Sequence, residues 1–175
     1  MNRPAQGGKV RTFFCRLGTA GENGPRFFGK EGMPVAVYHT ESRQQTVELG
    51  RRLAQTLSPG NLVLFTGGLG AGKTAFCEGI AQGLGCADPA SSPTFTIVNY
   101  YRGPRPFAHF DLYRLQNQED LEVAGFYDYL DQGAVVAAEW SENFADLLAD
   151  EKAVRVDIQV DGENSRAITI EGETI

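Results

Sequence analysis

Eight residues near the middle of the chain have the types and spacing of a phosphate-binding loop. They match the pattern G-x-x-x-x-G-K-[ST] at every position: Gly67, Gly68, Leu69, Gly70, Ala71, Gly72, Lys73 and Thr74. Glycines allow successive backbone N–H groups to converge on phosphate oxygens, because no Cβ atom stands in the way. We therefore predict that Lys73 contacts the β- and γ-phosphates and that the Thr74 hydroxyl is a hard oxygen ligand for Mg²⁺.

Two carboxylates follow apolar runs and are candidates to complete a magnesium shell. Residues 134–138 lead into Glu139, and residues 107–110 lead into Asp111. The carboxyl ends of parallel strands meet at the edge of the sheet where such a loop lies, so we expect both acids there. The alternative for either is an exposed strand-end carboxylate, and for Asp111 an ordinary ion pair with Arg114.

Strands and helices must bring these groups to one edge. The continuous apolar run at 61–66 predicts a buried parallel strand before the loop. Phe76, Ile80 and Leu84 recur at helical spacing, which predicts a helix over 73–84 that ends at Gly85. Further strands are expected at 35–39, 95–101, 107–113 and 134–139, and a hairpin is expected over 154–170. Further helices are expected at 42–58, 118–124, 127–130 and 141–148. Thr40 or Ser42 is the expected cap of the first of these helices, and Ser141 that of the last.

This alternation indicates an α/β fold: a single P-loop NTPase domain with a mixed, largely parallel central sheet, flanking helices and a C-terminal β-hairpin. We expect the domain to occupy residues 33–175. Residues 1–32 carry six basic and two acidic side chains, many glycines and no sustained period, and are expected to be a flexible extension.

Composition excludes several classes of protein. The 175 residues carry a formal charge of −6, so residues 33–175 carry −10, which argues against a free-standing nucleic-acid binder. No apolar run reaches the roughly 20 residues of a membrane helix. The cysteines, Cys15, Cys77 and Cys86, match neither a disulfide framework nor a zinc-site spacing, and a reducing cytoplasm fits them best.

Motifs that the sequence lacks limit which nucleotide base the protein can recognise and which reaction it can catalyse. There is no guanine-reading Asn/Thr-Lys-x-Asp motif, so adenine is the expected base. Small-molecule kinases carry an arginine-rich lid, and arginines after the loop are sparse here. Because none is placed as an obvious activating finger, hydrolysis by the isolated protein should be slow.

Taken together, the motifs resemble one family, the TsaE (YjeE-like) ATPases of tRNA threonylcarbamoyladenosine synthesis. The segments that carry the resemblance are G-x-L-G-A-G-K-T at 67–74, Ser-Pro-Thr-Phe-Thr at 92–96, His-Phe-Asp-Leu-Tyr-Arg-Leu at 109–115, Glu122-x-x-Gly125 and Glu139-Trp140. The resemblance implies an ATP- and Mg²⁺-dependent accessory subunit that works with TsaB and TsaD proteins and reaches tRNA only through that complex.

The resemblance also implies residue roles. Gly70 to Ala75 hold the phosphates, Thr74 and Glu139 bind Mg²⁺, Asp111 is a further catalytic carboxylate, Thr94 lies in a switch segment over 92–96, and Ser42, Thr46 and Arg166 are weaker matches for the adenosine end. From the residues alone, His109 is interpreted as a satisfied, half-buried histidine, with a catalytic role as the alternative. Trp140 is interpreted as a packing or partner-contacting residue.

Two other functions use the same features. A small-molecule or nucleoside kinase would use the loop to transfer phosphate to an acceptor, and the product would reveal it. A direct tRNA binder is the third hypothesis, against which the charge of residues 33–175 counts.

Overall fold

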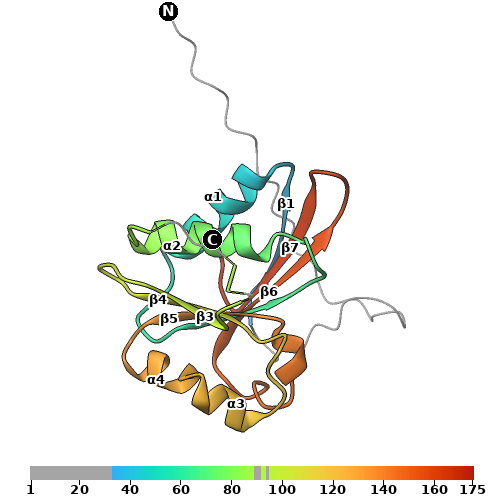
Figure 1. The fold of residues 1–175 in the computed structure, drawn as a ribbon. Helices are drawn as coiled ribbons and strands as arrows, with labels where there is room; N and C mark the ends of the chain where they lie inside the picture. Colours follow the sequence, from blue (N-terminus) through green and yellow to red (C-terminus); the bar gives the residue numbers. More distant parts are fainter. Residues whose placement is uncertain (1–32, 89–91, 94) are drawn as a thin grey trace, which may run out of the picture.

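The computed structural model describes residues 33–88, 92–93 and 95–175, so the expected extension over 1–32 and the switch residue Thr94 lie outside the described residues. Twelve elements follow one another along these described residues (Figure 1). They are β1 (Val35–Thr40), α1 (Arg43–Leu53), β2 (Leu62–Thr66), α2 (Lys73–Leu84), β3 (Val98–Tyr101), β4 (Phe107–Asp111), α3 (Gln118–Val123), α4 (Phe126–Asp131), β5 (Val135–Glu139), the 3₁₀ helix η1 (Ser141–Phe144), β6 (Ala153–Val160) and β7 (Arg166–Glu171).

All seven strands form one sheet in the order β1-β7-β6-β2-β5-β4-β3. The four neighbours β6, β2, β5 and β4 pair in parallel, and the remaining pairs are antiparallel. Five strands therefore run in one direction, and only β7 and β3 run in the other. This confirms the predicted mixed, largely parallel sheet and the C-terminal hairpin, which β6 and β7 form.

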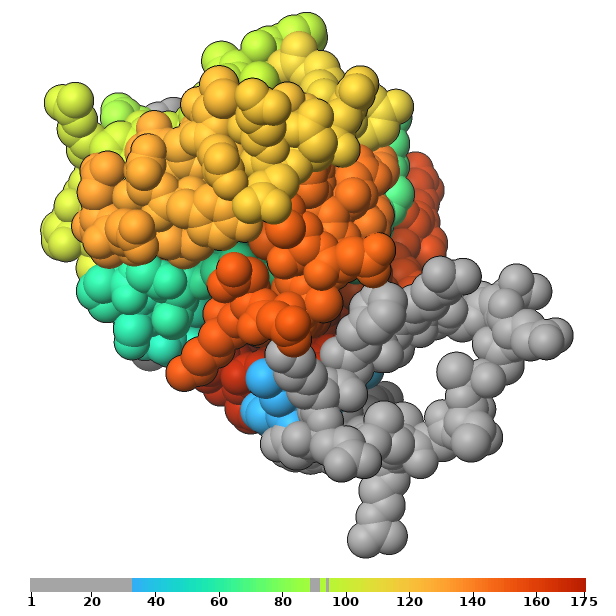
Figure 2. Space-filling model, turned by 90° about the horizontal axis from the view of Figure 1, so that it is seen from below, coloured from blue at the N-terminus to red at the C-terminus, as the bar shows by residue number. Residues whose placement is uncertain are grey.

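Helices cover both faces of this sheet. Figure 1 shows α1 and α2 on one face and α3 and α4 on the other, and Figure 2 shows residues of α3 and α4, in yellow and orange, across the lower face. Alternate residues of β2 divide between two hydrophobic clusters, with Val63 and Phe65 in the cluster that includes α2 and Leu62 and Leu64 in the cluster that includes α3. The run at 61–66 is uniformly apolar because both faces of this strand are buried.

Helices α1 and α2 approach each other closely through glycines. A Cβ atom on Gly50 would lie 2.2 Å from the carbonyl oxygen of Phe76, and one on Gly79 would lie 1.9 Å from that of Val47. No larger residue fits at these positions without moving backbone. The two helices therefore pack backbone against backbone along α1 and the first half of α2.

Helix α1 is shorter than predicted, ending at Leu53 rather than near residue 58. The backbone tightens there into i→i−3 hydrogen bonds, and the guanidinium of Arg105, far along the chain, donates to the carbonyls of Ala54 at 2.8 Å and Leu57 at 3.2 Å. These carbonyls are thereby satisfied without another helical turn. The early end of the helix is a tertiary effect.

Other predicted boundaries were also wrong, among them that of the strand expected over 107–113, which ends at Asp111. The strand expected from residue 95 begins at Val98, because residues 95–97 form a turn in which Thr96 and Ile97 donate to the carbonyl of Pro93 and the side chain of Phe95 is exposed. The helix expected over 141–148 is a single 3₁₀ turn ending at Phe144. Ser141 does not cap it, because its hydroxyl donates to the carbonyl of Phe65 at 3.0 Å. No helix in the described ranges is long and apolar enough to cross a membrane.

Candidate nucleotide-binding site

The predicted phosphate loop leaves the carboxyl end of β2 and enters α2. Gly67 has a φ of 129°, and a Cβ atom there would lie 2.4 Å from the carbonyl oxygen of Ile158 on β6. Gly72 precedes the helix with a φ of 111° and makes no side-chain cap. Since no side chain caps the first turn of α2, its N–H groups are available to an anion.

A cavity of about 400 Å³ lies over this loop and is of the size that small-ligand sites have. The predicted residues that line it are Ser42, Thr46, Leu69, Gly70, Ala71, Gly72, Lys73, Thr74, Ala75, Glu139 and Arg166. Gly67, Gly68 and Asp111 were predicted for the site and do not line the cavity, and Thr94 lies outside the described residues. Ser92, from the switch segment predicted over 92–96, also lines the cavity. Three lining residues were not predicted for it: Arg43, Trp140 and Asn164.

Lys73 is buried at the loop, with only 4% of its surface exposed. Its ammonium group donates to the carbonyls of Gly67 at 2.6 Å and Gly68 at 3.1 Å and lies 4.1 Å from the ring centre of Trp140. Burial lowers the pKa of Lys73, and the negative charge of Glu139 only partly offsets that effect. Within the described part of the chain no carboxylate forms an ion pair with this lysine, so an anion in the cavity would be its first charged partner.

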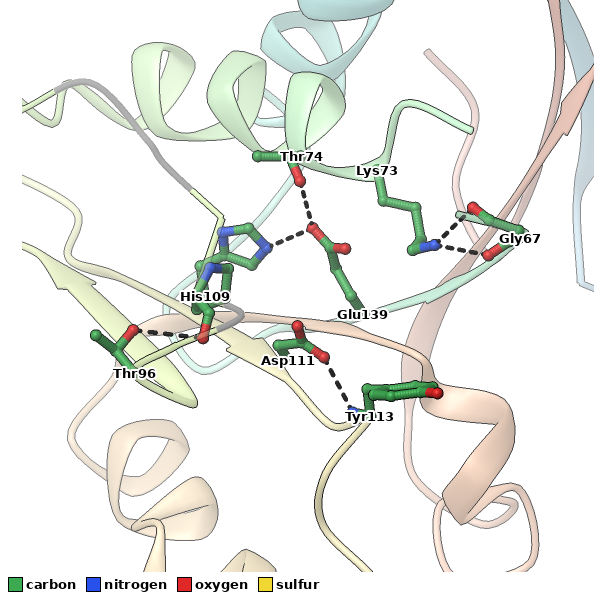
Figure 3. Close-up of polar contacts among 10 residues, drawn as sticks. Gly67, Lys73, Thr74, Thr96, His109, Asp111, Tyr113 and Glu139 are labelled. Carbon is green, nitrogen blue, oxygen red and sulfur yellow. Dashed lines mark hydrogen bonds and ion pairs between the residues drawn. The ribbon is translucent and has the colours of Figure 1, made fainter. Parts of the chain in front are cut away.

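Glu139, at the end of β5, joins the loop to the sheet. One carboxylate oxygen accepts hydrogen bonds from the Thr74 hydroxyl at 3.0 Å and from the His109 ring at 2.9 Å (Figure 3). Burial alone would raise the pKa of Glu139, but the contacts with His109, Thr74 and Lys73 outweigh burial and lower it. The group is therefore a buried, ionised carboxylate at the first turn of α2.

Asp111 sits beside Glu139 at the same edge of the sheet, because the two residues are paired in the β4–β5 register. Its Oδ1 atom accepts a hydrogen bond from the Tyr113 backbone N–H at 3.0 Å (Figure 3). The alternative ion pair with Arg114 is not found among the described residues. Asp111 is therefore a nearby buried acid, one strand further from the loop than Glu139.

The residues expected at the adenosine end come from two distant parts of the chain, the first turn of α1 with its cap and the start of β7. Arg166 at the start of β7 donates through Nε to the Ala71 carbonyl at 2.8 Å, which ties the hairpin to the phosphate loop. Ser42 caps α1 by accepting from the Gln45 N–H. The hydroxyl of Thr46 lies 2.9 Å from that of Thr40. All three predicted residues line the cavity, and the side chain of each also makes a hydrogen bond with a backbone group of the protein.

Sequence reasoning underestimated His109. It is fully buried rather than half-buried, and it contacts Glu139 directly. A strand has a period of two, so residues 107, 109 and 111 share the face that α2 covers, and this pattern could have placed His109 with Asp111. Trp140, with a φ of 61°, contacts Lys73 inside the site, which no local pattern indicates.

Comparison with known proteins identifies the family. Residues 40–168 match the family model described as "Threonylcarbamoyl adenosine biosynthesis protein TsaE". A tRNA threonylcarbamoyladenosine biosynthesis protein TsaE from Treponema pallidum is 35% identical over 131 residues, covering 75% of this chain and 96% of that protein. A protein of the same name from Nostoc is 41% identical over 104 residues, covering 57% of this chain and 64% of that protein.

A solved structure agrees in fold. The crystal structure of Bacillus subtilis YdiB superposes with a TM-score of 0.66 at 28% identity, covering 82% of this chain and 88% of that one. The family-model match extends from the end of β1 into β7, so it includes the loop, both strand-end carboxylates and Arg166. The chain belongs to the TsaE family.

Proposed function

We propose that this protein binds ATP with Mg²⁺ in the cavity over residues 67–75 and hydrolyses it slowly, as an accessory subunit in threonylcarbamoyl modification of the tRNA adenosine next to the anticodon. The observation that carries the nucleotide part is the contact between Thr74 at the start of α2 and Glu139 at the end of β5, 3.0 Å apart. It places a hydroxyl and a carboxylate, both hard oxygen ligands, beside the amides of the phosphate loop.

Lys73 and the glycines of the loop fit a nucleoside triphosphate. Lys73 holds two backbone carbonyls of its own loop, and a phosphate would offer it a full negative charge instead. Nothing lies within 4 Å of the positions where Cβ atoms on Gly68 and Gly70 would stand, so the loop surface is open to a ligand. In binding, Lys73 would leave the Gly67 and Gly68 carbonyls and turn to the phosphates.

The residues also fit a magnesium ion, which Thr74 and Glu139 would hold. Bound there, the ion would neutralise phosphate charge and polarise the attacking water. Glu139 is orientated for this role by His109 and Thr74, which both bond to Oε1, and Figure 3 shows the other carboxylate oxygen on the Lys73 side. Asp111, beside it in the register, is the candidate for a second catalytic carboxylate that orients water.

Slow hydrolysis by the isolated protein follows from the arginines of the cavity. Arg43 forms an ion pair with Glu78 on α2, and Arg166 donates to backbone carbonyls of its hairpin and of Ala71. Neither is free to stabilise charge on a transferring phosphoryl group, a contribution that an arginine finger makes in faster enzymes. A partner protein could supply it.

The partners are proposed from the family. The relatives are named for tRNA threonylcarbamoyladenosine biosynthesis, and we infer that this chain works with TsaB- and TsaD-type subunits, assembling or resetting the complex that transfers the threonylcarbamoyl group. The charge of −10 on residues 33–175 supports contact with tRNA through those subunits rather than directly.

The test combines association and product analysis. The protein is mixed with TsaB- and TsaD-type subunits with and without Mg-ATP, and co-elution and labelled products are followed. We expect nucleotide-dependent association, with ADP and phosphate as the only products, and Lys73→Ala should abolish both the association and the turnover. A phosphorylated small-molecule acceptor would instead identify a kinase. A salt-dependent gel shift of tRNA by the protein alone would identify a direct tRNA binder.

A further inference from the structure

Three metal-ligating side chains meet beneath the phosphate loop, from three different elements. Cys77 on α2, His109 on β4 and Glu139 on β5 each place one ligand atom within 4.8 Å of the others. All three are buried, with exposures of 0%, 0% and 5%. Over residues 33–88, 92–93 and 95–175 this is the one group of three or more His, Cys, Asp or Glu residues so arranged.

From this geometry we propose that Cys77, His109 and Glu139 form a binding site for a thiophilic divalent cation of the Zn²⁺ type, distinct from the Mg²⁺ site and sharing Glu139 with it. A thiolate sulfur, an imidazole nitrogen and a carboxylate oxygen are the donors that Zn²⁺ takes, whereas Mg²⁺ prefers oxygen alone. Three protein ligands leave a fourth position, which water can fill.

Charge balance favours a divalent cation at this buried site. The thiolate of Cys77 and the carboxylate of Glu139 together carry two negative charges, which neutralise a divalent cation, while His109 ligates as a neutral ring. A buried cluster without net charge avoids the large desolvation cost of an isolated ion. On binding, the cation takes the place of the Cys77 thiol proton, which is released to solvent.

The ring of His109 gives a second, independent indication. Its Nδ1 atom is buried and has no hydrogen-bond partner among the described residues, while Nε2 contacts Glu139. A buried polar atom without a partner costs about 1–3 kcal/mol. A cation ligated through Nδ1 would give this atom a partner, and Glu139, which also lines the nucleotide cavity, offers an entry route.

The shared carboxylate has a consequence for the nucleotide. A cation held by Cys77 and His109 would withdraw Glu139 from Thr74, so Zn²⁺ and Mg-ATP should compete. This competition rests on the function proposed above, whereas the cation site itself does not. The two are tested separately.

The cation site is tested on the nucleotide-free protein with Co²⁺ and Zn²⁺ alone. We expect one equivalent of Co²⁺ to give a thiolate-to-cobalt absorption band that Zn²⁺ abolishes. Cys77→Ser should lose the band and bind Zn²⁺ at least about tenfold more weakly, since even outer-shell changes cost that much. The double variant Cys15→Ser/Cys86→Ser, in which Cys77 is the only cysteine left, should keep both.

Absence of the band in the wild type, or its persistence in Cys77→Ser, overturns the proposal, as does its loss from the double variant. Thermal melting checks that Cys77→Ser is folded. If it is not, His109→Asn takes its place, and because that variant keeps the thiolate, the expected result is Zn²⁺ binding at least about tenfold weaker than in the wild type. In the second arm, Zn²⁺ should weaken Mg-ATP binding by the wild type and not by Cys77→Ser. Equal effects on both would refute the competition, while failure of the wild type to bind Mg-ATP at all would refute only the proposed function.

Discussion

Replacing Glu139 by Gln separates nucleotide binding from turnover. The amide keeps the size of the side chain, and its oxygen can still accept from Thr74 at 3.0 Å and from His109 at 2.9 Å, so the fold should persist. The change removes the negative charge that would balance the metal. Most phosphate contacts would come from loop amides and Lys73, so the affinity for Mg-ATP should fall less than about tenfold.

Hydrolysis should fall much further. Loss of one preorganised electrostatic group in a buried site costs roughly 10²–10³-fold in rate, or about 2.7–4 kcal/mol of transition-state stabilisation. Glu139 is 5% exposed and contacts the hydroxyl of Thr74, the proposed second metal ligand, so we expect a fall of at least about 10²-fold. The assay is single-turnover hydrolysis with TsaB- and TsaD-type partners present, because the free protein is expected to be slow.

Two comparison variants make the result specific. Asp111→Asn should reduce turnover less than Glu139→Gln does, because Asp111 is buried at the same edge but does not line the cavity. Glu142→Gln removes an exposed acid of η1 whose charge also reaches Lys73, and turnover should stay within about threefold. Near-normal turnover by Glu139→Gln would refute its metal role and leave Asp111 as the better candidate.

Three further outcomes are expected. Lys73→Met should abolish measurable Mg-ATP binding by calorimetry. The melting temperature should not fall, because burial already disfavours the charged form of Lys73 and lowers its pKa, and a clear loss of stability would contradict this. Gly79→Ala should destabilise the fold by about 1–3 kcal/mol, or roughly 2–12 °C in Tm, because the new Cβ would meet the Val47 carbonyl. Gly68→Ala, with open space around the new Cβ, should leave Tm unchanged. The pKa of Glu139 is lowered on folding, so its charge stabilises the protein above the ordinary value of 4.5 and that contribution is lost as pH falls through the folded value. Urea unfolding of wild type and Glu139→Gln at pH 7 and pH 4 should therefore show the larger difference at pH 7.

The sequence by itself determined the parts of the site that depend on neighbouring residues. The glycines of 67–72 and the apolar period of 73–84 fixed a loop and a helix whose predicted bounds, Lys73 to Leu84, are those of α2. The uniformly apolar strands required a sheet covered on both faces, and strand ends in such a sheet converge on one edge. For that reason the sequence could place Asp111 and Glu139 at the same edge of the sheet, whereas their pairing in the β4–β5 register is a finding of the structure.

Only the tertiary structure decided which groups touch across that edge. Three contacts depend on strand order and register: that of His109 with Glu139, that of Arg166 with the Ala71 carbonyl, and the approach of Cys77 to the His109 and Glu139 side chains. These contacts join residues roughly 30 to 95 positions apart, and no local period encodes them. The same is true of the early end of α1, where Arg105 satisfies the carbonyls that a further helical turn would otherwise have used.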